Sequence, residues 1–148
     1  AGQPLVVVDY SHTPDSLNTA LGALHEQSGA RLWCVFGCGG DRDRGKRPEM
    51  AAAAARWADE VVITDDNPRS ENGDVIVADI REGLPPGLET MVWRNRERAI
   101  RKAIGNAAPE DTILVAGKGH EPYQEISGVR RPFSDAAVVR LALRELGS

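Results

Sequence analysis

Short apolar runs rich in β-branched residues alternate along the chain with stretches in which apolar residues recur every three or four positions. The first pattern predicts buried strands and the second predicts amphipathic helices. Strands are predicted at 5–8, 32–36, 61–64 and 112–116, with a weaker one at 91–93. Alternation of strands with helices predicts an α/β, Rossmann-like three-layer sandwich with a mostly parallel sheet.

The helices are predicted from their apolar faces and their end signals. Thr13 is expected to cap a first helix that begins at Pro14 and ends at Ser28, because threonine at the cap followed by proline is typical of a helix start. Further helices are predicted over 48–58, 74–81 and 95–107, and a last one after a cap at Ser134.

Two local patterns refine this fold. In the helix over 74–81 we expect Val75, Ile76 and Ile80 to face the core. Ser127-Gly128 is a plausible hairpin turn between strands at 124–126 and 129–133, and this hairpin would add an antiparallel edge.

Composition excludes several classes of protein. The chain has 148 residues, which fits one domain with a single core. The net charge of -4 argues against nucleic-acid binding. No apolar run approaches the ~20 residues that a membrane span needs, and no secretory signal begins the chain. The first strand starts almost directly, at Leu5, which is typical of an excised domain.

The sequence has two cysteines, Cys34 and Cys38. They are too few for a disulfide framework, and no histidine stands at a ligand spacing from them. We therefore interpret them as buried or loop thiols rather than as zinc ligands, and expect no metal site. A reducing cytoplasm fits this chain best.

Each of the four strongest strands is followed by a polar loop that contains glycine or proline. Ligands of open parallel sheets bind beyond the carboxyl ends of the strands. The four loops should therefore lie at one edge of the molecule and form one site.

The loop from Gly40 to Arg47 nearly matches the phosphate-binding pattern G-x-x-x-x-G-K-S/T. Arg47 stands where that pattern has a hydroxyl, and Asp41 and Asp43 would repel phosphates. We favour a loop that offers guanidinium groups to a carboxylate or phosphate. The alternative is a solvated charge cluster with internal Asp–Arg pairs.

Asp66-Asn67-Pro68-Arg69 follows the third strand. Proline fixes its own backbone torsion and biases Asn67 toward an extended conformation, so the turn is stiff. It would hold an amide and a guanidinium in fixed directions, which suits the carboxylate of an amino acid. A purely structural turn is equally compatible with the sequence, because Asn-Pro often opens loops.

Gly117-Lys118-Gly119-His120-Glu121 follows the last parallel strand. The glycines allow the backbone to come close to a ligand, and Glu121 can accept hydrogen bonds from an ammonium group. We interpret His120 as a local hydrogen-bonding residue, and the Gly-Lys-Gly run by itself is weak evidence.

Asp9 and His12 end the first strand, just before a predicted helix N-terminus. Such a terminus attracts anions, so His12 could meet a phosphate there. The alternative is that both side chains only order the turn.

Taken together, the loops place both charge signs at one edge. Arg42, Asn67, Arg69 and Glu121 would face one another there, which suits a zwitterionic ligand.

These motifs resemble those of the Mur ligases, and among them the branch that adds meso-diaminopimelate to a UDP-linked muramyl dipeptide. The resemblance rests on Asp9–Asp15, Gly37–Asp43, Asp66–Arg69 and Gly117–Glu121, in the same order and at similar spacing. It extends over the whole chain but covers only the C-terminal third of such an enzyme. Relatives that add L-lysine are expected to depart from the Asp-Asn-Pro-Arg element, above all at its arginine.

The resemblance implies roles for individual residues. Arg42, Asn67 and Arg69 would hold the carboxylates of diaminopimelate, and Glu121 with the backbone of Gly117 would hold its distal ammonium. Asp66 would mainly shape the turn that Pro68 stiffens. The implied diaminopimelate site comprises Arg42, Asp66, Asn67, Pro68, Arg69, Gly117 and Glu121, and the implied ATP-facing residues are Asp9 and His12.

The resemblance also implies a reaction. ATP activates the D-glutamate side-chain carboxylate as an acyl phosphate, which the amine of the incoming amino acid attacks. ATP, Mg²⁺ and the UDP-MurNAc-dipeptide would be held mainly by nucleotide-sugar and ATPase domains that this chain lacks, so we expect the isolated chain to be inactive. Alternatives are a stand-alone Rossmann-like binding module or a domain of another Mur-type ligase, such as a folylpolyglutamate or cyanophycin synthetase.

Overall fold

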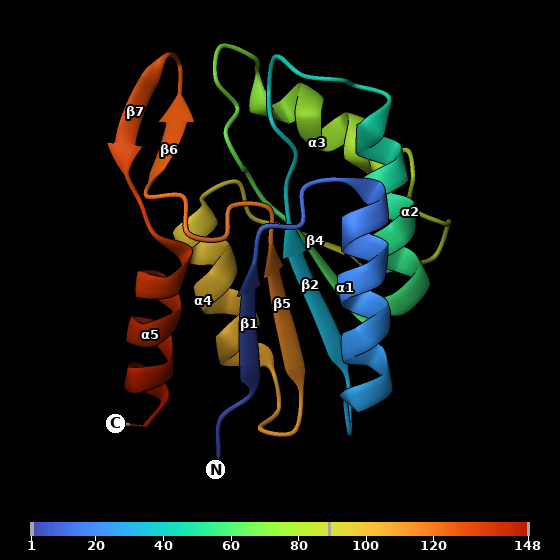
Figure 1. Ribbon diagram of the computed structural model, residues 1–148, viewed down its shortest axis with the longest axis vertical. Coiled ribbons are helices and arrows are strands. Elements are labelled where there is room, and N and C mark those ends of the chain that lie inside the picture. The colour runs from blue at the N-terminus through green and yellow to red at the C-terminus, as the bar shows by residue number, and fades with distance from the viewer. Residues whose placement is uncertain (1, 89, 148) are drawn as a thin grey trace.

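A computed structural model describes residues 2–88 and 90–147 of the chain. In this part a five-stranded parallel sheet, in the order β1-β5-β2-β3-β4, lies between two layers of helices (Figure 1). The predicted α/β three-layer fold is confirmed. The strands of this sheet are β1 (Leu5–Asp9), β2 (Leu32–Phe36), β3 (Glu60–Ile63), β4 (Thr90–Val92) and β5 (Thr112–Ala116).

Three helices cover one face of the sheet and two cover the other (Figure 1). Among the described residues, no helix has both the length and the apolar character that crossing a membrane requires. The first face carries α1 (Pro14–Gln27), α2 (Lys46–Trp57) and α3 (Gly73–Arg81), and the second carries α4 (Arg96–Asn106) and α5 (Asp135–Leu146).

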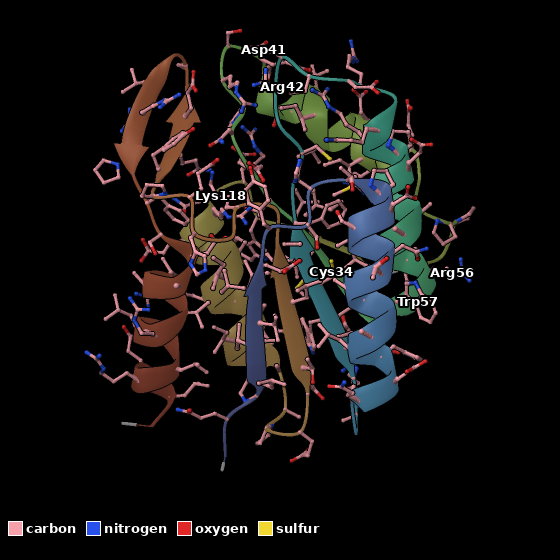
Figure 2. All side chains as sticks on the ribbon, in the orientation of Figure 1. Cys34, Asp41, Arg42, Arg56, Trp57 and Lys118 are labelled. Carbon is pink, nitrogen blue, oxygen red and sulfur yellow. The ribbon has the colours of Figure 1, made fainter. Side chains whose placement is uncertain are left out.

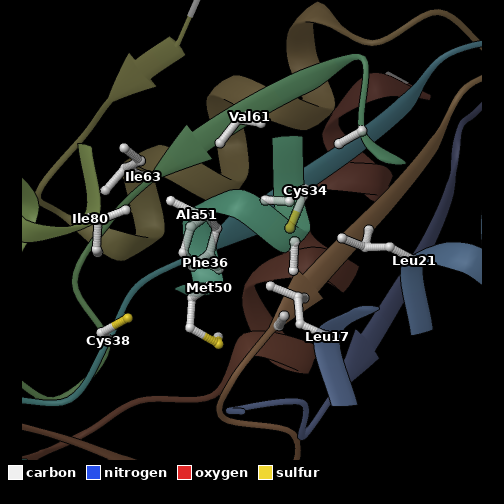
Figure 3. Close-up of a cluster of buried hydrophobic side chains, with 14 of the residues drawn as sticks. Leu17, Leu21, Cys34, Phe36, Cys38, Met50, Ala51, Val61, Ile63 and Ile80 are labelled. Atoms are coloured by element: carbon white, nitrogen blue, oxygen red, sulfur yellow. The ribbon is translucent and has the colours of Figure 1, made fainter. Parts of the chain in front are cut away.

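Strand β2 shows how the sequence builds two cores at once. All five of its residues are buried. Cys34 and Phe36 pack with α1, α2 and α3 (Figure 3), whereas Trp33 and Val35 pack with α4 and α5. Successive side chains of a strand point to opposite faces, so a continuous apolar run is what a strand covered on both sides requires.

Both cysteines are free and buried in the core that packs against α1, α2 and α3 (Figure 3). This confirms the interpretation of both as buried thiols. Burial raises the pKa of Cys34 to about 12. Burial and the nearby Asp66 carboxylate also raise the pKa of Cys38 to about 12. Both groups are therefore protonated, weakly nucleophilic thiols at neutral pH.

The helix starts follow the capping signals. Thr13 Oγ1 accepts a hydrogen bond from Ser16 N at 3.1 Å, and Thr13 N donates to Ser16 Oγ at 3.1 Å, which completes a capping box. Helix α2 begins at Lys46, two residues before the predicted start at Pro48. Proline is compatible with the first turn of a helix, where its missing N–H has no partner in any case.

The expectation that Val75 faces the core is wrong. Its exposure is 37%, whereas Ile76, Val77 and Ile80 are buried. At about 100° per residue, Ile76, Val77 and Ile80 fall on one face of α3, and Val75 falls on the far side.

The predicted hairpin forms from β6 (Tyr123–Ile126) and β7 (Val129–Pro132). Ser127 and Gly128 adopt φ angles of 52° and 75°, the left-handed pair that a two-residue hairpin turn favours. The hairpin is a separate two-stranded sheet and does not extend the main sheet. Instead it pairs with the turn after β3: Arg69 N donates to Glu125 O at 3.0 Å, and Ser127 N donates to Arg69 O at 2.7 Å.

The topology creates an opening between neighbouring strands β2 and β5. The chain that leaves β2 continues to α2 on one face, whereas the chain that leaves β5 continues through the hairpin to α5 on the other face. Loops that part in this way leave a crevice at the carboxyl edge of the sheet.

A buried ion pair joins the elements around this edge. Arg96 and Asp135, both with fully buried side chains, begin α4 and α5 and form two hydrogen bonds of 2.8 Å. Arg96 also donates to Ala116 O at 3.1 Å and to Asp65 O at 3.0 Å. One guanidinium thereby connects both helices to the ends of β5 and β3.

We expect Arg96→Met to destabilise the chain by about 3–5 kcal/mol, because it leaves Asp135 buried without its partner. Arg101→Met on the same helix is the matched control. Arg101 pairs with Glu97 and Glu145 at the surface, so its loss should cost about 1 kcal/mol or less. Urea denaturation measures both values, and equal losses would contradict the assigned role of the buried pair.

Candidate functional site

A pocket of about 280 Å³ lies at the carboxyl edge of the sheet, where the loops after β1, β2, β3 and β5 converge. Seven of the residues selected from the sequence line it, and two, Asp9 and Pro68, do not. The lining consists of Tyr10, His12, Gly37, Cys38, Gly39, Arg42, Lys46, Asp66, Asn67, Arg69, Gly117 and Glu121.

The loop after β2 lies directly against the turn after β3. Gly40 N donates to Asn67 O at 2.8 Å, and a Cβ on Gly40 would collide with the carbonyl group of Pro68. Glycine is therefore required at this contact. Pro68 is buried and belongs to the wall behind the pocket.

Arg69 occupies the left-handed region, with φ of 55°. This conformation costs a residue with a side chain about 1–2 kcal/mol. The two backbone hydrogen bonds from the hairpin hold it there. Its Nη1 donates to Gly40 O at 3.0 Å, and its Nε lies 3.9 Å from Glu125 Oε1. The guanidinium is thus oriented by backbone groups and only loosely paired with a carboxylate.

Asn67 is 2% exposed and its amide is largely engaged inside the protein. Its Oδ1 accepts from Lys118 Nζ at 2.8 Å and from Glu125 N at 2.9 Å, while its Nδ2 donates to Glu121 Oε1 at 2.8 Å. Only the second N–H of Nδ2 is left for a ligand. The amide therefore mainly organises the pocket.

Lys118 is a central residue that the sequence argument missed. Its side chain is fully buried, and Figure 2 places it in the interior below the loop that carries Asp41 and Arg42. Nζ donates to Glu121 Oε1 at 2.8 Å and to Asn67 Oδ1 at 2.8 Å. A lysine directly after an apolar strand, between two glycines, is the signal that indicates it.

The backbone on both sides of Lys118 is held by hydrogen bonds to the end of β1. Gly117, with φ of +116°, and Gly119, with φ of +54°, adopt conformations that favour glycine. Their N–H groups donate to Asp9 O at 3.1 and 3.2 Å. The loop after β5 is thereby attached to the end of β1.

Glu121 lines the pocket with its carboxylate. Burial tends to raise the pKa of this group, but hydrogen bonds from Lys118 and Asn67 outweigh burial and lower the pKa below its usual value. Both hydrogen bonds end on Oε1. In the described part of the chain Oε2 has no partner and is not buried, so it can accept from a ligand.

Arg42 and Lys46 also line the pocket and add positive charge to it. Arg42 is exposed and its Nη1 donates to Asp41 O at 3.0 Å. Within the described residues neither Arg42 nor Lys46 forms an ion pair, so both cations can meet an anionic ligand. The sequence pattern did not single out Lys46, because the loop that contains it departs from the phosphate-binding pattern in which this lysine would contact a phosphate.

Residues 1–119 match the family described as "Mur ligase, glutamate ligase domain". The chain belongs to the Mur ligase family. It is 58% identical over 142 residues to the UDP-N-acetylmuramoyl-L-alanyl-D-glutamate–2,6-diaminopimelate ligase of Xanthomonas campestris pv. campestris, which covers 96% of this chain and 29% of that protein. The chain thus spans less than a third of the length of this curated relative.

Solved structures agree with this assignment. A UDP-N-acetylmuramoyl-L-alanyl-D-glutamate–2,6-diaminopimelate ligase superposes with a TM-score of 0.95 at 45% identity, over 100% of this chain and 31% of that chain. A bifunctional folylpolyglutamate synthase/dihydrofolate synthase from Yersinia pestis superposes with a TM-score of 0.61 at 22% identity, over 79% of this chain and 26% of that chain. The second similarity shows the fold alone.

Asp9 of this Mur ligase chain lies beside the main pocket, whereas His12 lines it. Both line a neighbouring pocket with Tyr10, Ser11, Thr13 and Ser16. The Asp9 carboxylate accepts from Ser11 N at 3.1 Å and from Ser11 Oγ. His12 is exposed and stacks edge-on against Tyr10, with 4.8 Å between ring centroids. Both residues order the turn, and their contact with ATP stays a prediction.

The charged loop between β2 and α2 is exposed from Asp41 to Gly45, as a solvated cluster would be, but its arginines do not pair with the carboxylates of its own aspartates. Arg47 is fully buried and donates to Glu71 at 2.7 Å through both Nη atoms, to Asp79 at 2.9 Å and to Gly39 O at 3.1 Å. Arg44 also pairs with Asp79. These arginines bind acidic groups in and just before α3, which leaves Arg42 as the arginine of this loop that lines the pocket.

The Arg47–Glu71 pair should make the free energy of unfolding depend on pH in the acid range. A hydrogen bond from Arg47 lowers the pKa of Glu71 to about 2. A carboxylate with a depressed pKa stabilises the fold fully above its unfolded value of about 4.3, and this contribution is lost as the pH falls toward 2.

We expect Glu71→Gln to be less stable than the wild type at pH 7 and to lose less stability between about pH 4.3 and pH 2. Denaturation across that range measures the difference. Glu97→Gln, which removes a half-exposed carboxylate paired on the surface of α4, is the control and should follow the wild type. Parallel curves for Glu71→Gln and the wild type would refute this coupling.

Proposed function

We propose that this chain is the amino-acid-binding domain of a ligase that adds meso-diaminopimelate to UDP-MurNAc-L-Ala-D-Glu in peptidoglycan synthesis. The observation that carries the proposal is the charge arrangement of the pocket. Arg42, Lys46 and Arg69 line it with positive charge, and Glu121 lines it with an available carboxylate oxygen.

This arrangement suits a molecule with ammonium and carboxylate groups at both ends. Glu121 Oε2 accepts from the distal ammonium, while Arg69 binds the carboxylate beside it. Arg42 holds the carboxylate at the other end, where the attacking amine must reach the acyl phosphate. The domain then acts mainly by positioning that amine.

Arg69 is the residue that selects the substrate in this proposal. L-Lysine lacks the second carboxylate of meso-diaminopimelate. A lysine in the pocket would leave the Arg69 guanidinium without an anion, and unpaired polar groups in a binding site penalise the wrong ligand strongly. Hydrogen bonds from Nη1 to Gly40 O and Asn67 O hold the guanidinium in its direction.

ATP and Mg²⁺ are assigned to the remainder of such a ligase. Among the residues that the structure describes, no group of three or more His, Cys, Asp or Glu side chains could hold a metal ion. Asp9 and His12 would face the nucleotide from this domain, and the UDP-MurNAc-dipeptide would bind elsewhere. We expect no ligation by the isolated chain. We propose that the reaction of the whole ligase takes place in the cytoplasm.

An NMR titration of the labelled chain tests the proposal. meso-Diaminopimelate should shift the resonances of the loops around Arg42, Asn67–Arg69 and Gly117–Glu121, and L-lysine should bind at least tenfold more weakly. Arg69→Met should weaken diaminopimelate binding about tenfold or more and remove most of the difference between the two ligands.

Arg56→Met is the matched control. Arg56 lies over Trp57 on α2, on the flank of the molecule away from Arg42 (Figure 2). Its loss should leave both affinities unchanged. Equal binding of both ligands by the wild type would rule out Arg69 as the selector, and shifts confined to other surfaces would refute the pocket assignment.

A further inference from the structure

Lys118 lies at the junction of two loops that form the pocket. Its Nζ is 2.8 Å from Asn67 Oδ1, in the turn after β3, and 2.8 Å from Glu121 Oε1, in the loop after β5. Asp66 Oδ1 is 3.7 Å away, and the Tyr123 ring centroid is 5.8 Å away. The side chain itself is fully buried and does not line the pocket.

These contacts constrain the Glu121 carboxylate in two ways. Lys118 and Asn67 both bind Oε1, so the carboxylate plane is held by two donors from different directions. Oε2 is the atom left available to a ligand. The position of the free oxygen thus depends on a cation that a ligand need not touch.

The charged groups around Lys118 leave a negative charge that one further cation could neutralise. The ammonium of Lys118 stands against two carboxylates, Asp66 and Glu121, and these three groups sum to one negative charge. The guanidinium groups of Arg69 and Arg96 also act on these carboxylates, but each has a carboxylate partner of its own, Glu125 and Asp135. A ligand ammonium on Oε2 neutralises the remaining negative charge. Without Lys118, Glu121 would lose a hydrogen bond and an opposite charge in a partly buried site, and its ionised form would be less favourable.

We propose that Lys118 is the positioning residue of the ammonium subsite: it orients Glu121 through Oε1 and keeps Glu121 ionised, so that Oε2 can bind the amino-acid ammonium. This inference rests on the proposed function. It assigns to Lys118 an action through Glu121 and not a contact with substrate.

The test compares Lys118→Met with the wild type in the same chain. Methionine keeps much of the side-chain volume and removes the charge. In the ligand-free protein, carbon-detected NMR should show the Glu121 pKa raised, because burial is no longer offset by the lysine. At pH 7, meso-diaminopimelate should bind about tenfold or more weakly. The acid limb of its affinity profile should move to higher pH.

Lys102→Met is the matched control. Lys102 lies on the exposed side of α4, with Nζ 5.1 Å from the Trp93 ring centroid. It should change neither the Glu121 pKa nor the affinity. An unchanged Glu121 pKa in Lys118→Met overturns the proposal, and so does a raised pKa with unchanged affinity and pH profile.

A measurement on the wild type covers the case in which Lys118→Met does not fold. The hydrogen-bonded ammonium of Lys118 should give a persistent side-chain ¹⁵N–¹H signal at neutral pH that shifts when diaminopimelate binds. A Lys118 ammonium signal that does not shift when diaminopimelate binds overturns the proposal. Failure of the wild type to bind diaminopimelate at all is a failure of the proposed function, and the ligand-free Glu121 pKa then decides the role of Lys118.

Discussion

A cation buried beneath the loops must be surrounded by acceptors, and this requirement shapes the whole carboxyl edge of the sheet. Lys118, Arg96 and Arg47 all have fully buried side chains. A buried charge without partners is too costly to exist in a stable fold. Each cation draws its acceptors from elements far apart in sequence, so the loops that satisfy them are fixed relative to one another. The loops that form the pocket are therefore tied to one another through these cations.

These connections between the loops matter for the function proposed for this Mur ligase chain. A ligand with charges of both signs gains from groups that are already oriented, because little ordering remains to be done on binding. The Asn67 side-chain amide organises the pocket in this way, since most of its hydrogen bonds are made to Lys118, Glu121 and the hairpin. Glu121 and Arg69 then present the groups that remain open to a zwitterion.

The fold could be predicted from the sequence because each strand has a local signature. The five-residue apolar run of β2 indicates burial on both faces, and Thr13-Pro14 marks the start of α1. The site could be predicted as a region because parallel strands bring their carboxyl ends together. Partner choice could not be predicted: Arg47 pairs with Glu71 and Asp79 rather than with an aspartate of its own loop, and the hairpin pairs with Arg69 rather than with the sheet edge. Such pairings join positions distant in sequence, which patterns of residue type do not encode.

A crystal structure of the chain with meso-diaminopimelate tests the central claim most directly. The account predicts one ligand ammonium about 2.7–3.2 Å from Glu121 Oε2 and the carboxylate beside it paired with Arg69, with Lys118 still bound to Oε1. A ligand bound outside the pocket, or bound inside it with no carboxylate on Arg69, would contradict the account.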